Sequence, residues 1–118
     1  MKKILIVDDE FSVRELISNS VRNFTDYSPE IAPDGKEAVK LVMTNDYDLI
    51  ILDMLMPEMS GEEVYTRLQS LAPDLPVLVM SGYSSEISVD TILKDKRNKF
   101  IQKPFTIEEL SKIVRECL

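Results

Sequence analysis

The stretch Ile4-Leu5-Ile6-Val7-Asp8-Asp9, close to the N-terminus, is a short apolar run that ends in two carboxylates. Such a run, bounded by charge, favours a strand that is buried on both faces, as in a parallel sheet. The pattern returns at Leu49-Ile50-Ile51-Leu52-Asp53, again with an aspartate at its end. Two strands of this kind predict a parallel sheet whose strand ends carry polar side chains at one edge.

Strand-like and helix-like segments alternate along the whole chain. Strands are predicted at 3–8, 49–53, 75–81 and 100–103, with a weaker candidate at 27–32. The segments between them have apolar residues at helical spacing. Three helices are predicted to begin with a capping box, a capping residue three positions before a glutamate: Asp34 with Glu37, Ser60 with Glu63, and Thr106 with Glu109. This alternation predicts an α/β fold, a doubly wound five-stranded parallel sheet with helices on both faces.

Composition narrows the function. The 118 residues predict a single domain over 1–118, and 14 basic against 21 acidic side chains give a net charge of -7. That charge argues against direct binding to nucleic acid or to anionic lipid. Because the chain has no histidine, catalytic triads, histidine-ligated zinc and a phosphohistidine donor are excluded. The apolar stretches are too short to span a membrane, so we expect a cytoplasmic protein.

Polar side chains end four of the predicted strands: Asp8 with Asp9, then Asp53, Ser81 and Lys103. In doubly wound sheets, ligands bind beyond these strand ends. If the first and third strands are neighbours, three carboxylates converge, and such a cluster calls for a compensating cation. Oxygen ligands without histidine or cysteine favour Mg2+. Taken singly, each residue is at least as well explained by a helix start, a turn or a surface charge, so their joint placement carries the prediction.

Four motifs occur in order along the chain: Ile4-Leu5-Ile6-Val7-Asp8-Asp9-Glu10, Asp53-Met54-Leu55-Met56-Pro57-Glu58-Met59-Ser60-Gly61, Met80-Ser81-Gly82 and Lys103-Pro104-Phe105. With these motifs the sequence resembles the response-regulator receiver domains, also called CheY-like, over essentially its whole length. The resemblance implies a flavodoxin-like (βα)5 fold with strand order 2-1-3-4-5.

The resemblance also implies a chemical role for each site residue. Asp53 is the expected phosphoacceptor, and Ser81 and Lys103 are expected to contact the phosphoryl group. Phosphoryl transfer depends mainly on positioning and on charge neutralisation, which Mg2+ and Lys103 would supply. Mn2+ is an expected substitute for Mg2+. The expected metal ligands are Asp9, Asp53 and the backbone carbonyl of Leu55, with Asp8 acting mainly through bound water.

Further positions are expected to govern switching. Phe100 is either the aromatic switch that moves together with Ser81, or an aromatic residue that simply packs in the core. Gly82 either leaves space for the phosphoryl group or is an ordinary turn glycine. The Lys103-Pro104 peptide bond is either cis, which would aim the lysine into the cleft, or that of an ordinary strand-ending proline.

The resemblance implies that the lifetime of the phosphorylated form depends on two positions. Leu55 lies two residues after the phosphoacceptor Asp53, and Tyr83 lies two residues after the hydroxyl residue Ser81. Both side chains are bulky and uncharged, so slow self-dephosphorylation is expected. The helix predicted at 84–98 is the weakest, because few of its residues form an apolar stripe, and 94–99 lack the Gly-Ala often found in the family. A weakly anchored helix of this kind suits a conformational switch or a plain surface helix equally.

The expected partners are a histidine kinase or a histidine phosphotransfer domain. A downstream protein is expected on the face made by the fourth helix, fifth strand and fifth helix, since no effector domain is visible in the chain. The stretches Ser81-Gly82-Tyr83-Ser84 and Gln102-Lys103-Pro104-Phe105 are most similar to receivers attached to hybrid sensor kinases. The chain is therefore expected either to be a piece of a longer protein or, as Met1 favours, to begin at its natural N-terminus.

Three other functions compete with this interpretation. A magnesium-dependent phosphohydrolase with an aspartyl-phosphate intermediate would need an acidic residue where Leu55 stands. A flavodoxin-like nucleotide or flavin carrier would need a glycine-rich phosphate loop after the first strand, where the sequence has Asp8-Asp9-Glu10. The intact set of site residues argues against a degenerate receiver that switches without phosphorylation.

Overall fold

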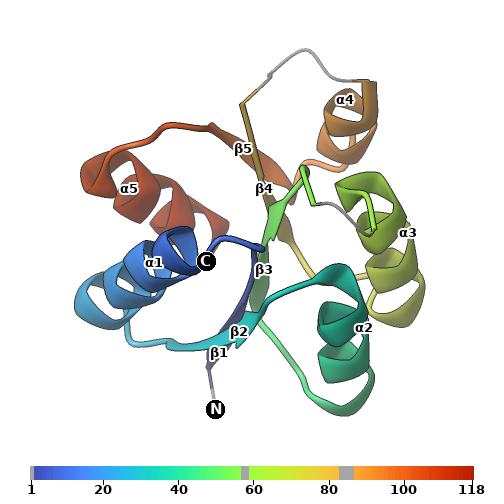
Figure 1. The fold of residues 1–118 in the computed structure, drawn as a ribbon, viewed down its shortest axis with the longest axis horizontal. Coiled ribbons are helices and arrows are strands. Elements are labelled where there is room, and N and C mark those ends of the chain that lie inside the picture. The colour runs from blue at the N-terminus through green and yellow to red at the C-terminus, as the bar shows by residue number, and fades with distance from the viewer. Residues whose placement is uncertain (1, 57–58, 83–86) are drawn as a thin grey trace.

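The computed structural model describes residues 2–56, 59–82 and 87–118, where five strands alternate with five helices (Figure 1). The strands are β1 Lys3–Val7, β2 Ser28–Ala32, β3 Leu49–Asp53, β4 Val77–Ser81 and β5 Lys99–Gln102. The helices are α1 Phe11–Phe24, α2 Gly35–Thr44, α3 Gly61–Leu71, α4 Ile87–Leu93 and α5 Ile107–Cys117. All strand pairs are parallel, in the order β2-β1-β3-β4-β5, which confirms the predicted fold.

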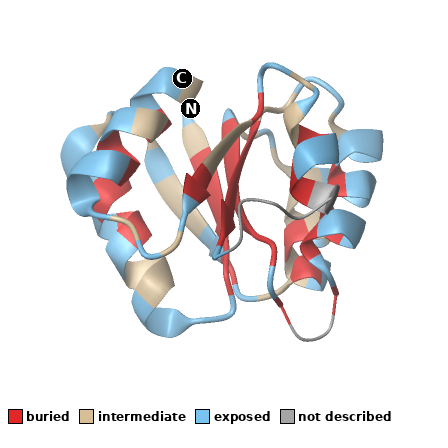
Figure 2. Ribbon diagram, turned by 90° about the horizontal axis from the view of Figure 1, so that it is seen from above, coloured by how far each residue is buried: buried red, intermediate tan, exposed pale blue. Residues whose placement is uncertain are grey.

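The sheet is covered on both faces, with α1 and α5 on one face and α2, α3 and α4 on the other (Figure 1). Side chains alternate between the two faces along a strand. In β3, therefore, Leu49 and Ile51 enter the α1–α5 core, while Ile50 and Leu52 enter the opposite core. All four side chains are fully buried, and Figure 2 shows the central strands as the most buried part of the molecule. Burial on both faces explains why these strands are apolar along most of their length, up to Asp53 at the end of β3 and Ser81 at the end of β4.

None of the helices in the described ranges is long and apolar enough to cross a membrane.

The three predicted helix N-caps are present. The side chains of Asp34, Ser60 and Thr106 accept hydrogen bonds from the backbone N–H three residues later, at 2.8, 3.2 and 3.1 Å respectively. At α5 the side chain of Glu109 also bonds back to the N–H of Thr106, which completes a capping box. Within the described ranges, only α5 has this reciprocal pair, so the prediction of full capping boxes is wrong for α2 and α3, where only the N-cap half of the box is formed. These local bonds satisfy backbone donors that the helices themselves leave free.

The helix predicted at 84–98 is wrong in its C-terminal part, while 84–86 lie outside the described residues. α4 ends at Leu93, and tight backbone turns follow, closed by the N–H of Asn98 on the carbonyl of Asp95 at 3.0 Å. The side chain of Asp95 accepts from the backbone N–H of Arg97 at 3.0 Å, a local bond that competes with helix formation. The helix therefore stops five residues before Asn98.

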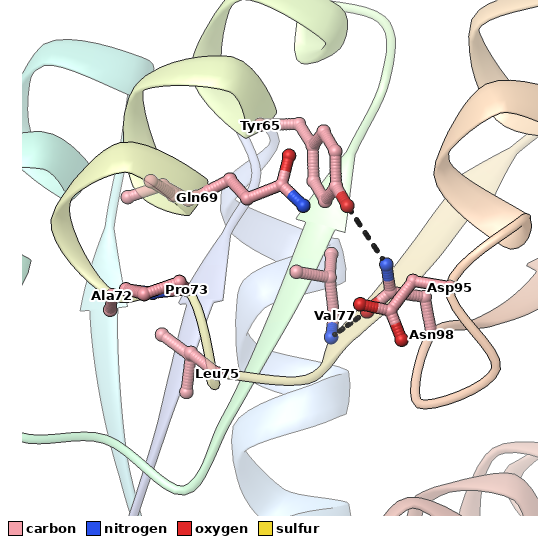
Figure 3. A pocket seen from close by; sticks show the side chains of 9 residues that line it. Tyr65, Gln69, Ala72, Pro73, Leu75, Val77, Asp95 and Asn98 are labelled. Atoms are coloured by element: carbon pink, nitrogen blue, oxygen red, sulfur yellow. Dashed lines mark hydrogen bonds between the residues drawn. The ribbon is translucent and has the colours of Figure 1, made fainter.

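Asn98 is a buried polar residue that joins three elements. Its side-chain oxygen accepts from the N–H of Val77 at 2.9 Å, and its amide nitrogen donates to Tyr65 Oη and to the carbonyl of Ile92, both at 3.0 Å. Figure 3 shows this amide beside a small pocket that α3 and the loop after it share with the turn before β5. The bonds connect the start of β4, helix α3 and the end of α4. The sequence did not indicate this role, because two of the three partners are backbone groups and the third is a hydroxyl group on a distant helix.

Gly61 is required by close packing at the start of α3. A Cβ at this position would lie 2.5 Å from the Cα and the sulfur of Met54. Gly61→Ala is expected to lower the free energy of unfolding by about 1–3 kcal/mol, because overpacking displaces a neighbouring backbone. Urea unfolding followed by circular dichroism measures the loss. Gly82→Ala is the matched control, since no described residue lies within 4 Å of its Cβ position, and equal losses in both variants would contradict the packing explanation.

Candidate functional site

The predicted site residues meet at the C-terminal edge of the sheet. β1 lies between β2 and β3, so the ends of β1 and β3 are adjacent. Asp8 directly follows β1, Asp53 ends β3 and Ser81 ends β4, and all three are buried, with at most 3% of their surface exposed. The neighbouring Asp9 is exposed. Parallel strands thus place side chains that are far apart in sequence around one cleft edge.

The carboxylates of Asp8, Asp9 and Asp53 form a cluster. One oxygen from each residue lies within 4.8 Å of the others. Three like charges at this spacing repel one another unless a cation compensates them. Two buried carboxylates and one exposed carboxylate offer hard oxygen donors with access to solvent, a set that fits Mg2+, which keeps several waters. The sequence-based prediction that these three residues come together is therefore correct, while their role as metal ligands stays a prediction.

Lys103 follows β5 and reaches the same cluster. Its Nζ lies 3.0 Å from Asp8 Oδ2 and 3.4 Å from Asp53 Oδ2. The peptide bond to Pro104 is cis, one of the two alternatives that the sequence left open. The Lys103 ammonium therefore neutralises part of the charge of two buried carboxylates. The remaining negative charge of the cluster would favour binding of a second cation.

The environment shifts two pKa values in the site. Burial, together with the negative charge of Asp8, raises the pKa of Asp53 to about 6, although the Leu55 N–H and Lys103 act in the opposite direction. For Lys103, burial lowers the pKa, but the hydrogen bond to Asp8 and the charges of Asp53 and Asp8 outweigh it, so the pKa is raised. Lys103 is thus charged at neutral pH, whereas ionisation of Asp53 lowers the stability of the folded protein.

That cost predicts a pH-dependent gain in stability for Asp53→Asn in metal-free buffer. The pKa of Asp53 is raised from 3.8 to about 6, so the wild type takes up a proton on folding between these values. The contribution of Asp53 to stability is therefore full below pH 4 and is lost as pH rises through 6. At pH 7 the variant is expected to unfold with a free energy about 2 kcal/mol higher than the wild type.

Urea titrations of both proteins at pH 4 and pH 7 measure this difference. The gain should vanish near pH 4, where the wild-type carboxyl is protonated in the folded state. A difference that does not change with pH would show that burial of the Asp53 charge is not its cause.

The other predicted positions are Leu55, Gly82, Phe100 and Tyr83. Leu55 is exposed, and its N–H donates to Asp53 Oδ1 at 3.1 Å. Gly82 is exposed with open space around it among the described residues. Phe100 is half-buried and packs against the core under α2, α3 and α4. Tyr83 lies outside the described residues.

One residue near the site was not predicted. Arg14, in α1, donates from Nη1 to the backbone carbonyl of Asp8 at 2.9 Å. Every residue has a backbone carbonyl, so a side chain that bonds to one does not form a recognisable pair in the sequence. For this reason the sequence pattern did not indicate a role for Arg14.

Comparison with known proteins decides the family. A model of the response regulator receiver domain matches residues 4–115 of this chain. The chain belongs to the response-regulator receiver family. It is thus a receiver domain of a two-component response regulator, as the resemblance implied. The buried Asp8 and Asp53 lie with Lys103 at the C-terminal edge of its sheet.

Relatives of this receiver domain include larger response regulators. Response regulator MprA of Mycobacterium sp. (strain KMS) is 39% identical over 116 residues, which are 98% of this chain and 50% of the relative. MprA of Mycobacterium avium (strain 104) is 37% identical with the same coverage. The receiver domain spans about half the length of the curated relatives it matches.

Solved receiver structures have the same fold. Chemotaxis response regulator CheY4 of Vibrio cholerae is 31% identical, with a TM-score of 0.86 over 100% of this chain and 99% of that chain. Response regulator TrrA of Thermotoga maritima, solved in complex with Mg(2+)-BeF, is 34% identical, with a TM-score of 0.85 over 100% of both chains. These two receivers and this chain therefore share the same fold over the ranges compared.

Proposed function

We propose that this receiver domain accepts a phosphoryl group on Asp53 in a Mg2+-dependent reaction and signals by a change in partner binding. The observation that carries the proposal is the position of Asp53, buried among two further aspartates with Lys103 Nζ 3.4 Å away. A buried carboxylate whose pKa is raised to about 6 is more basic than a free one and is held in one orientation by the Leu55 N–H. Both properties favour a nucleophile over a purely structural role.

The proposed reaction is an in-line displacement at phosphorus. A carboxylate oxygen of Asp53 forms the new P–O bond, while the bond from phosphorus to the nitrogen of a donor phosphohistidine, or to the oxygen of acetyl phosphate, breaks with its electron pair. These 118 residues contain no histidine, so a histidine donor would lie outside them, on a histidine kinase or a histidine phosphotransfer domain. Lys103 neutralises charge that develops on the phosphoryl oxygens.

Mg2+, when bound, would compensate the negative charge of the carboxylates and of the phosphoryl group. The residues proposed to hold it are Asp9, Asp53 and the carbonyl of Leu55, with Asp8 acting mainly through water. TrrA, which is 34% identical and was solved in complex with Mg(2+)-BeF, supports a cation site of this kind.

The proposed output is a change of the face made by α4, β5 and α5. Phosphorylation adds a charge of about -1.5 to -2 at the cleft edge. Ser81 at the end of β4 and Lys103 after β5 are proposed to move toward it, with Phe100 in β5 following. Such a shift would bias an existing equilibrium and alter affinity for a downstream protein.

The test of the proposal is the intact mass of the protein after incubation with acetyl phosphate, with and without Mg2+. The expected result is one added phosphoryl group that requires the metal. Release of many phosphates per chain would instead favour a phosphohydrolase. Absence of any adduct, also with a histidine kinase as donor, would favour a receiver that switches without phosphorylation.

The phosphorylated form is expected to be long-lived. The exposed Leu55 side chain lies next to the acceptor and has no polar group to orient an attacking water. Leu55→Asn, which introduces such a group, is expected to speed loss of the phosphoryl group by about tenfold, less than a general base contributes, because an amide orients water without taking its proton. Decay of the phosphorylated mass with time measures the rate. An unchanged rate would remove position 55 from control of the lifetime.

A further inference from the structure

Every polar atom of Asp8 has a partner within the chain. Its backbone N–H donates to the carbonyl of Ala32 at 3.3 Å, and its Oδ1 accepts from the N–H of Glu10 at 2.8 Å. Its Oδ2 accepts from Lys103 Nζ at 3.0 Å, and its carbonyl accepts from Arg14 Nη1 at 2.9 Å. Asp8 is completely buried. Four bonds from four different segments therefore fix both its side chain and its backbone.

The hydrogen bond from Arg14 is made to the backbone carbonyl of Asp8 and not to its side chain. The carbonyl of Asp8 belongs to the peptide unit that leads to Asp9, and a peptide unit is planar. Fixing its oxygen therefore fixes the direction in which the chain enters Asp9. Asp9 itself is exposed, yet its carboxylate lies within 4.8 Å of those of Asp8 and Asp53. Its place in the cluster thus depends on the backbone that precedes it.

We infer that Arg14 is a positioning residue for the divalent-cation site, holding the Asp8-Asp9 peptide unit so that the Asp9 carboxylate faces Asp53. The inference rests on the proposed function, because it concerns the cation that the proposed reaction requires. Residues that orient metal ligands commonly change metal affinity by 10-fold or more when they are removed.

Arg14 is itself held in place. Its backbone N–H bonds to the carbonyl of Glu10 at 3.1 Å in the first turn of α1, and its guanidinium carbon lies 5.7 Å from the centre of the Phe11 ring. Phe11 is 68% exposed, so core packing does not account for this aromatic side chain. Stacking against a guanidinium restricts the arginine before any cation binds. The hydrogen bond from Arg14 thus fixes the backbone at Asp8 before a cation binds.

Charge and positioning predict opposite effects of removing Arg14. The guanidinium is a positive charge beside a cation site, so by Coulomb repulsion alone its loss would strengthen Mg2+ binding. Positioning predicts weaker binding, because the peptide unit before Asp9 becomes free to turn. The sign of the change therefore separates the two explanations.

The experiment measures Mg2+ binding to the full chain by isothermal titration calorimetry for the wild type, Arg14→Met, Arg14→Lys and Arg22→Met. Arg22 is exposed in the last turn of the same helix, so its variant removes an equal charge without touching Asp8. Arg14→Met is expected to bind Mg2+ about tenfold more weakly. Arg14→Lys should recover part of the affinity, since an ammonium donates to a carbonyl, and Arg22→Met should stay within about twofold of the wild type.

Thermal unfolding without metal shows whether Arg14→Met folds. If it does not, Phe11→Leu, which keeps the arginine but removes its stacking partner, is expected to weaken Mg2+ binding about fourfold, more than the Arg22→Met control. Equal or tighter binding by Arg14→Met, or by Phe11→Leu where that variant replaces it, would overturn the inference while leaving the proposed function intact. A wild type that does not bind Mg2+ would overturn the proposed metal dependence, and the inference with it.

Discussion

Asp53→Asn is expected to abolish phosphoryl uptake. Asparagine has nearly the same shape as aspartate, and its oxygen can still accept from the Leu55 N–H, which is 3.1 Å from Asp53 Oδ1. Its amide has no anionic oxygen to attack phosphorus, however, so the reaction loses its nucleophile. The intact mass after incubation with acetyl phosphate and Mg2+ should therefore stay unchanged, against one added phosphoryl group in the wild type.

Asp34→Asn is the matched control for this experiment. Asp34 caps α2 by accepting from the N–H of Glu37 at 2.8 Å, and asparagine caps helices equally well. This variant should gain the phosphoryl group as the wild type does. Uptake by Asp53→Asn at the wild-type level would place the acceptor elsewhere and would contradict the proposed function. The urea titration of Asp53→Asn at pH 7 shows whether the variant is folded, so that a negative result can be told from unfolding.

Asn98→Ala is expected to lower the free energy of unfolding by about 2–4 kcal/mol, because three hydrogen bonds are lost and their partners stay buried. The N–H of Val77 and the carbonyl of Ile92 would be left without the amide that now serves them. Val77 and Ile92 are 3% and 1% exposed, so water has little access to replace the bonds. Urea unfolding followed by circular dichroism measures the loss.

Tyr65→Phe tests one bond of this network alone. It removes the hydroxyl that accepts from Asn98 at 3.0 Å and keeps the ring, so a loss of about 1 kcal/mol is expected. A loss below this value in Asn98→Ala would mean that the end of α4 is not held by the Asn98 side chain. The comparison separates the bonds to backbone groups from the bond to the hydroxyl.

The local pattern of the sequence determined the five strands, most of the helices and the three N-caps. Strands buried on both faces must be apolar throughout, and capping bonds join residues only three apart, so both features are visible along the chain. The residues that end the strands followed from the same pattern. The strand order came from the family resemblance, since the residues alone do not state which strands are neighbours.

Only the tertiary structure decided how the site residues act on one another. Lys103 Nζ reaches Asp8 over 95 positions of sequence, and burial raises the pKa of Asp53 to about 6. Distances and burial of this kind arise from the packing of several elements at once. The contacts of Arg14 and Asn98 escaped prediction because they end largely on backbone groups, which every residue has. Sequence therefore determined which groups stand at the edge of the sheet, and packing decided their charge, orientation and support.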